Sequence, residues 1–253
     1  MRRAARIGLT AIALTDHDSV GGVPEAVAEG ERLGVRVVSG CEFSTSAPWG
    51  EMHVLGYFLP SEHPTLAGFL QRCREDRIRR GREMVAALQA WGVDVSFEDL
   101  AAETGGAAMG RPHLARALVR LGKVTSVDAA FQQWLGKGKR AYVEKRLPTF
   151  REVADLVHLT GGIVSAAHLR ERANRAILEA FKEEGLDAVE TRHPAHSGEL
   201  RARLTELARN LGLFPTGGSD WHGDDDAEST HGMIGSEEVP AEWLEILDRR
   251  VAP

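Results

Sequence analysis

The sequence predicts an α/β protein, built on a parallel sheet or barrel with a small helical insertion. Three observations support this prediction. Short apolar runs alternate with helix-like segments at both ends of the chain, no strand-like run occurs between about residues 65 and 135, and acidic or histidine side chains follow most of the apolar runs. Alternating strands and helices are typical of sheets whose strands run in parallel.

Six apolar runs bounded by glycine or polar residues are predicted to be strands. They are too short to be helices, and several are rich in valine and isoleucine. The predicted strands span residues 11–14, 35–38, 52–58, 163–166, 188–189 and 213–216.

Helix signals separate these strands. Residues 24–34 begin with a proline and end at a glycine, which is the usual order at the two ends of a helix. Thr149 and Glu152 form a capping-box pattern that begins another helix. Residues 1–8 are expected to be the tail of a helix. The helix that begins at Thr149 is predicted to span residues 149–160, and two further core helices are predicted at residues 174–184 and 197–211.

The middle of the chain contains helix patterns alone. Residues 66–91 form one long helical pattern, and Ser96 with Asp99 begins a second helix. Further helices are predicted at residues 112–121 and 126–135, each followed by glycine. We therefore expect three parts: a first core part at 1–60, a helical insertion at 61–145 and a second core part at 146–253.

Composition narrows the class of protein. The chain has 253 residues, of which 43% are hydrophobic and 27% charged, as in ordinary globular proteins. The formal net charge of −6 excludes a basic protein that coats nucleic acid, so we expect no bulk DNA binding. No apolar run is long enough to span a membrane. With two cysteines there is no disulfide framework, and we expect a cytoplasmic protein.

Polar residues follow the predicted strands in a repeated pattern. TDHD follows the first strand, CE the second, AHL the fourth, HPAH the fifth and SDWH the sixth, and the third strand contains a histidine. The ends of strands in an α/β barrel converge on one face. Imidazole and carboxylate groups are ligands for divalent transition metals. A single histidine after a strand is more often a hydrogen-bonding group, so the prediction of a metal site depends on the recurrence.

These stretches resemble a known family. The matching segments are LTAIALTDHDSVGG, VVSGCEFSTSAPWGEMHVLGY, GRPHLARALV, KGKRAYVEKR, GGIVSAAHL, GLDAVETRHPAHS and TGGSDWHG, which cover nearly the whole chain in order. Together they resemble the PHP (polymerase and histidinol phosphatase) superfamily of metal-dependent phosphoesterases. GRPHLARALV and the helical insertion are most similar to nucleoside 3′,5′-bisphosphate phosphatases and RNase AM, a 5′→3′ RNA exonuclease. The resemblance implies a distorted seven-stranded β/α barrel with a helical insertion.

The resemblance also implies a set of metal ligands. We expect Asp16 and Asp18 to orient the histidine between them. A complete family site would hold two or three divalent ions, with manganese expected first and zinc or iron as alternatives. The ligands implied by the resemblance are His17, Glu42, His53, His168, Asp220 and His222.

One departure concerns the start of the family pattern, which opens with a strand carrying an H-x-H pair and then an aspartate. Only sixteen residues precede His17. We therefore expect the first strand and three ligands to be missing, with fewer ions bound and low or absent turnover in this truncated chain. A non-catalytic remnant that serves as a binding module is the corresponding alternative.

Substrate-binding residues are expected in and after the insertion. A phosphate monoester needs positive charge, which Arg111 of GRPH and Arg146 of VEKR could supply in bidentate fashion, with Lys139 a weaker candidate. His113 could bind the phosphate, and His196 could protonate the leaving oxygen. For Arg111 the competing interpretation is a surface residue at a helix start.

The function implied is hydrolysis of phosphate monoesters of nucleotides. We expect the 3′-phosphate of nucleoside 3′,5′-bisphosphates to be the target, or 5′→3′ trimming of short RNA, so the partner is a small phosphorylated nucleotide or short RNA. Another PHP phosphatase, such as a histidinol-phosphate phosphatase, is an alternative that the insertion with GRPH disfavours. Trp49 and Trp221 adjoin the predicted site, where each could contact a nucleobase or pack in the fold.

Overall fold

The computed structural model describes residues 1–104, 109–223 and 231–251. The chain divides into two compact units. The first, called the core unit, contains residues 1–66 and 147–253, and the second, called the insertion unit, contains residues 67–146. Sequence analysis placed the insertion at 61–145.

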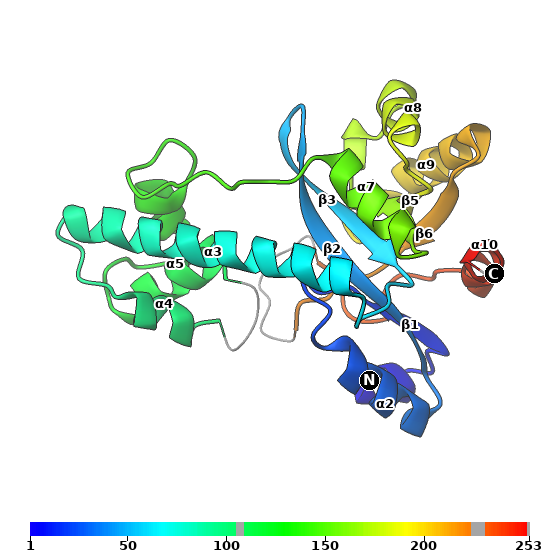
Figure 1. The fold of residues 1–253 in the computed structure, drawn as a ribbon, viewed down its shortest axis with the longest axis horizontal. Helices are drawn as coiled ribbons and strands as arrows, with labels where there is room; N and C mark the ends of the chain where they lie inside the picture. The colour runs from blue at the N-terminus through cyan, green and yellow to red at the C-terminus, as the bar shows by residue number, and fades with distance from the viewer. Residues whose placement is uncertain (105–108, 224–230, 252–253) are drawn as a thin grey trace. The chain divides into compact units, whose positions relative to one another are not determined.

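The core unit is built on one curled sheet with the strand order β1-β2-β3-β4-β5-β6 (Figure 1). Strands β1 and β2 are parallel, as are β4, β5 and β6, whereas β3 is antiparallel to both of its neighbours. Five strands therefore run in one direction and β3 runs in the other. This arrangement confirms the mixed α/β fold. The strands are β1 (Ala11–Leu14), β2 (Arg36–Ala47), β3 (Gly50–Tyr57), β4 (Ile163–Ala166), β5 (Ala188–Arg192) and β6 (Phe214–Gly217).

The prediction of a parallel sheet was wrong for β3. β2 continues well beyond the predicted 35–38 and pairs with β3 as far as Ala47 and Gly50, so Pro48 and Trp49 form a two-residue connection. A connection this short can join only antiparallel strands. Gly50 has φ +116°, a conformation that L side chains rarely adopt, so glycine is needed where the hairpin turns.

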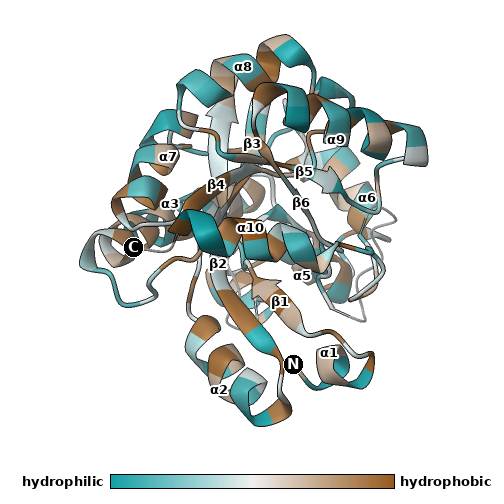
Figure 2. Cartoon of the chain, turned by 90° about the vertical axis from the view of Figure 1, so that its right-hand side faces the viewer, coloured by the Kyte–Doolittle hydropathy of each residue, from teal (hydrophilic) through white to brown (hydrophobic). Residues whose placement is uncertain are grey.

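Helices cover the sheet of the core unit. α2 contacts β2, α7 contacts β2, β3 and β4, and α9 contacts β5 and β6. In Figure 2 the outer surfaces of α8 and α9 are mostly teal, whereas brown residues are concentrated on strands such as β2 and β4. The capping box of Thr149 and Glu152 is present at the start of α7. The core helices are α1 (Arg2–Arg6), α2 (Val23–Leu33), α7 (Phe150–Leu159), α8 (Arg175–Glu183), α9 (Gly198–Leu211) and α10 (Ala241–Val251), with a 3₁₀ turn at Arg170–Arg172.

In its described part, the insertion unit has helices as its only regular secondary structure, joined by turns and irregular segments. Its core is a cluster of leucines that includes Leu88, Leu100, Leu114 and Leu118, all fully buried. The expected helix over 126–135 changes from α to π geometry at its middle. The elements are α3 (Pro64–Ala90), which begins in the core unit, α4 (Phe97–Ala102), α5 (Arg111–Arg120), α6 (Val127–Ala130) and the π turn Phe131–Leu135.

α3 is the longest helix, with 27 residues, and it is highly charged. Arg79 lies 2.7 Å from Asp76 and 2.6 Å from Glu83, at the i,i+3 and i,i+4 spacings that place side chains on one helix face. These ion pairs make the charged run a salt-bridged face. Within the described ranges, no helix combines the length and the apolar character that crossing a membrane requires.

Candidate metal centre

The strand directions bring the predicted ligands to one end of the sheet. His17 follows β1 and His168 follows β4, at the carboxyl ends of two strands that share a direction. β3 runs the opposite way, so its amino-terminal half, which carries His53, lies at this same end. His53 was expected inside the third strand and lies within β3, whereas Glu42 was expected after the second strand and lies in the middle of β2. The long hairpin is the reason.

Glu42 is the centre of a first cluster. The residue is 5% exposed, and its Oε1 atom lies 2.8 Å from His53 Nδ1 and 3.1 Å from His168 Nε2. These two nitrogens are 3.3 Å apart, and His17 Nδ1 lies 3.7 Å from Glu42 Oε2. Two ligands at about 2.1 Å in a tetrahedral site are separated by about 3.4 Å. The donor atoms are therefore spaced as ligands of shared cations would be.

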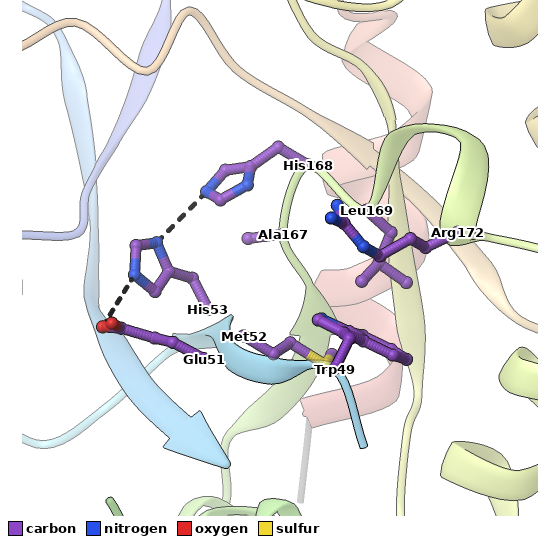
Figure 3. Close-up of a pocket in the computed structure, with 8 residues that line it drawn as sticks. All are labelled: Trp49, Glu51, Met52, His53, Ala167, His168, Leu169 and Arg172. Atoms are coloured by element: carbon purple, nitrogen blue, oxygen red, sulfur yellow. Dashed lines mark hydrogen bonds and ion pairs between the residues drawn. The ribbon is translucent and has the colours of Figure 1, made fainter. Parts of the chain in front are cut away.

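The electrostatics of this cluster favour a bound positive charge. Burial alone would raise the pKa of Glu42, but the hydrogen bonds from His168 and His53 outweigh burial and hold it well below its usual range. Burial alone would lower the pKa of His53, but its bonds to Glu42 and Glu51 raise it to about 9. Figure 3 shows His53 between Glu51 and His168. Near pH 7, protonated His53 thus offsets the charge of Glu42, as a bound cation would.

Asp220 is the centre of a second cluster beside the first. Asp220 Oδ2 lies 3.3 Å from His231 Nε2 and 3.3 Å from His193 Nε2, and His222 Nδ1 lies 3.6 Å from Asp220 Oδ1. The rings of His222 and His231 are stacked with centroids 4.2 Å apart. The His222 ring lies 5.8 Å from that of His17, so the two clusters adjoin. The structure thus brings all six expected ligands together.

Two histidines of the second cluster were not assigned a role from sequence. His193 is 1% exposed, and its Nδ1 accepts a hydrogen bond from Ala195 N at 3.0 Å. Its Nε2 must then carry the proton and donate it toward Asp220, which fixes the orientation of that carboxylate. The HPAH segment after β5 was the available signal. For His231 the sequence offers none, because no motif links it to Asp220.

Backbone strain occurs at two of the expected ligands. His168 has φ +28° and Asp220 has φ +53°, both in the left-handed region that side chains disfavour. Glu190, buried in the middle of β5, accepts a hydrogen bond from His168 N at 2.7 Å and so holds this turn. Burial raises the pKa of Glu190 well above its usual range. Strain of this kind persists where surrounding contacts enforce it and is concentrated at functional sites.

The aspartates beside His17 connect its loop to β2. Asp18 Oδ1 accepts a hydrogen bond from Ser44 N at 3.1 Å, and the Asp16 carbonyl accepts one from Glu42 N at 3.2 Å. Burial raises the pKa of Asp16. These bonds position the loop, and a direct role of either carboxylate in orienting His17 stays a prediction.

Arg111 makes contacts within the insertion unit. Its Nη1 donates to Leu135 O at 3.3 Å, and its guanidinium lies 5.6 Å from the Phe131 ring centroid and 5.5 Å from that of Tyr142. Each contact joins parts of this unit that are far apart in sequence. The side chain therefore has a packing function, and phosphate binding by Arg111 stays a prediction.

The other three candidates for substrate binding also belong to the insertion unit. His113 Nδ1 accepts a hydrogen bond from Gly110 N at 3.2 Å and so caps α5, while burial lowers its pKa. Lys139 and Arg146 are exposed. Their roles toward phosphate stay predictions.

His196 is buried next to His193, with the two ring centroids 5.4 Å apart. It is 3% exposed, its Nδ1 donates to Thr191 O at 3.1 Å, and its Nε2 has no hydrogen-bond partner among the described residues. Burial lowers its pKa to about 4. His196 is therefore neutral near pH 7 and its Nε2 is a proton acceptor. This disfavours the predicted role as proton donor to the leaving oxygen.

The lowered pKa of His196 predicts acid sensitivity. Because the unfolded chain takes up this proton near pH 6.5 and the folded chain near 4, stability is retained above pH 6.5 and lost as pH falls toward 4, by about 2–3 kcal/mol. His196→Asn retains a donor for Thr191 O and should flatten this part of the profile. Urea unfolding at several pH values between 4 and 7 measures the effect. An identical pH slope in the variant would contradict it.

Comparison with known proteins shows to which family the chain belongs. Residues 1–229 match the PHP domain family. The chain is 30% identical over 227 residues to a 5′-3′ exoribonuclease of Haemophilus influenzae, covering 88% of this chain and 82% of the relative. It is 32% identical over 229 residues to a 3′,5′-nucleoside bisphosphate phosphatase of Chromobacterium violaceum, covering 87% and 79%. A solved structure of a candidate metal-dependent phosphoesterase from Bifidobacterium adolescentis superposes with a TM-score of 0.84 at 27% identity, covering 100% and 90%. The chain therefore belongs to the PHP domain family.

Proposed function

We propose that this protein is a divalent-metal-dependent phosphoesterase that removes the 3′-phosphate from nucleoside 3′,5′-bisphosphates, and that it can also trim short RNA from the 5′ end. The observation that carries the proposal is the meeting of the Glu42 and Asp220 clusters at one end of the sheet. The names of two relatives, an exoribonuclease and a bisphosphate phosphatase, support phosphate esters of nucleotides as substrates.

The ions would be held by both clusters. Glu42 with its three histidine neighbours would form one part, and Asp220 with His222 would form the other, with His231 as a further candidate ligand. Imidazole and carboxylate donors suit manganese, zinc or iron, and we propose manganese first. Bound divalent ions supply Lewis acidity, which activates water near neutral pH and offsets the charge of a phosphoryl group.

The remaining residues have positioning and binding roles in this proposal. His193 orients Asp220, and Glu190 holds the turn that presents His168. His196 accepts a proton through Nε2 rather than donating one, because its neutral form is favoured. Four residues are proposed to bind phosphate by charge or hydrogen bonding: Arg111, His113, Lys139 and Arg146.

Phosphate release from defined substrates tests the proposal. With Mn²⁺ present, we expect adenosine 3′,5′-bisphosphate to yield adenosine 5′-monophosphate, and histidinol phosphate to react at least about a hundredfold more slowly. A 5′-phosphorylated RNA oligonucleotide tests the second activity. The proposal fails if Mn²⁺, Zn²⁺ and Fe²⁺ each give no hydrolysis of any nucleotide substrate while the protein is folded. Binding of the nucleotide without turnover would instead support a binding module.

A further inference from the structure

A small cavity adjoins the Glu42 cluster in the core unit. It has a volume of about 90 Å³. Pockets that enclose a whole small ligand usually measure about 300–1,000 Å³. This cavity is therefore sized for one group of a substrate rather than for all of it. Its lining residues are Trp49, Glu51, Met52, His53, Ala167, His168, Leu169 and Arg172.

The cavity has one polar wall and one apolar wall. The polar wall contains His53 and His168, the same side chains that contact Glu42, so a group held here would lie next to a phosphate at the metal centre. On the other side are the Trp49 ring and Leu169, with Arg172 beside them (Figure 3). A small anion alone would leave this apolar wall without a partner. A flat aromatic ring would cover it.

The Trp49 side chain is held in place by packing against buried aromatic rings. It lies at the tip of the β2–β3 hairpin, and its ring packs edge-on against Phe181 with centroids 6.1 Å apart. Phe181 in turn packs against Phe150 at 4.6 Å, and both phenylalanines are buried. These contacts anchor the hairpin tip to α8 and α7. Little conformational entropy is therefore lost when a ligand stacks on the Trp49 ring.

Arg172 provides a second planar group at the same place. Its guanidinium carbon lies 6.0 Å from the Trp49 ring centroid, and the side chain is exposed. Guanidinium groups stack on aromatic rings and also attract anions. Tryptophan and arginine together suit a π-system that is attached to a negatively charged phosphate ester.

We propose that the cavity beside Trp49 and Arg172 is the nucleobase subsite, in which the base stacks on Trp49 while the phosphate lies at the metal centre. This inference rests on the proposed function and names the part of the substrate that the core unit recognises. Because every base has a stacking face, the subsite accepts purines and pyrimidines and favours nucleotides over base-free sugar phosphates.

Calorimetric binding of three probes tests the subsite: adenosine 5′-monophosphate, uridine 5′-monophosphate and ribose 5-phosphate, each with Mn²⁺ present. We expect both nucleotides to bind at least about tenfold more tightly than ribose 5-phosphate. Trp49→Leu should weaken the nucleotides by about tenfold and leave ribose 5-phosphate unchanged. The matched control is Trp91→Leu, since Trp91 also carries a stacked arginine, Arg140 at 3.8 Å, but belongs to the insertion unit.

A second variant covers the case in which Trp49→Leu fails to fold, as judged by circular dichroism. Arg172→Gln changes an exposed side chain and should weaken the nucleotides severalfold more than ribose 5-phosphate. Equal losses for all three probes would show that phosphate occupies the cavity and would overturn the proposal. An unchanged preference for nucleotides in Trp49→Leu would also overturn it.

The two proposals can fail separately. If nucleotide binding depends on Trp49 but adenosine 3′,5′-bisphosphate is not hydrolysed, the subsite stands and the proposed function fails. If hydrolysis occurs and Trp49→Leu leaves KM unchanged for adenosine 3′,5′-bisphosphate and for ribose 3,5-bisphosphate, the function stands and the subsite fails.

Discussion

Glu42→Gln is expected to remove tight divalent-metal binding and with it phosphoesterase activity. The substitution keeps the size of the side chain but removes the negative charge that His53 and His168 contact at 2.8 and 3.1 Å. Loss of a group that only supports a metal ligand costs about 10–100-fold in affinity, so loss of this central carboxylate should cost more than about a hundredfold. Metal analysis after dialysis and phosphate release from adenosine 3′,5′-bisphosphate measure the two effects.

Glu29→Gln is the matched control for the change of charge. Glu29 lies on α2, where it pairs with Arg32 at 2.8 Å and Arg2 at 3.2 Å, and it belongs to neither candidate metal cluster. Exposed pairs of this kind contribute little, so metal content and activity should stay at the wild-type level. If Glu42→Gln is folded and retains its ions, Glu42 is not a ligand and the assignment of the first cluster is wrong.

Metal binding is expected to become tighter as pH rises toward 9. In the metal-free chain, the pKa of His53 is raised to about 9, so a metal that binds this ring must first displace a proton. The apparent affinity should therefore rise by up to about tenfold per pH unit below pH 9. The bond of protonated His53 to Glu42 stabilises the metal-free fold fully below pH 6.5 and loses this effect as pH passes through 9.

These two trends act in opposite directions on thermal stability. Between pH 6.5 and 8.5, the Tm measured with a chelator should fall relative to the Tm measured with Mn²⁺, so the difference between them should widen. Differential scanning calorimetry at three pH values measures it. His53→Gln removes the proton in question and should reduce the widening. A difference that stays constant with pH in the wild-type chain would exclude His53 as the group that metal displaces.

Local sequence signals identified most of the elements but not their pairing. The capping boxes at Thr149 and Ser96 mark helix starts because they depend on residues three apart, and both are present. The reversal of β3 depends on pairing across the hairpin, so its apolar residues 52–58 gave no sign of direction. α10 was not predicted, because its role depends on packing Leu247 against strands distant in the chain.

The residues of the candidate site also divide into those that local sequence predicts and those that only tertiary contacts reveal. The expected ligands came from motifs and from a family resemblance, and the structure gathers them at one end of the sheet. Their partners could not be found in this way. His231 meets Asp220, and Glu190 meets the His168 turn, through contacts that no local pattern encodes. The stacking of Arg111 on two rings of the insertion unit was equally hidden.

The sequence by itself determined the chemistry of this protein: an acidic chain without a disulfide framework, alternating strands and helices, and histidine and carboxylate groups recurring where strands end. Periodicity, capping and ligand type are properties of neighbouring residues. Only the tertiary structure decided that β3 is antiparallel to its neighbours and that Glu42 lies buried between the imidazoles of His53 and His168. The same holds for Trp49, which lines a cavity beside these two histidines. The reason is physical: strand direction, burial and pKa depend on residues brought together across the whole chain.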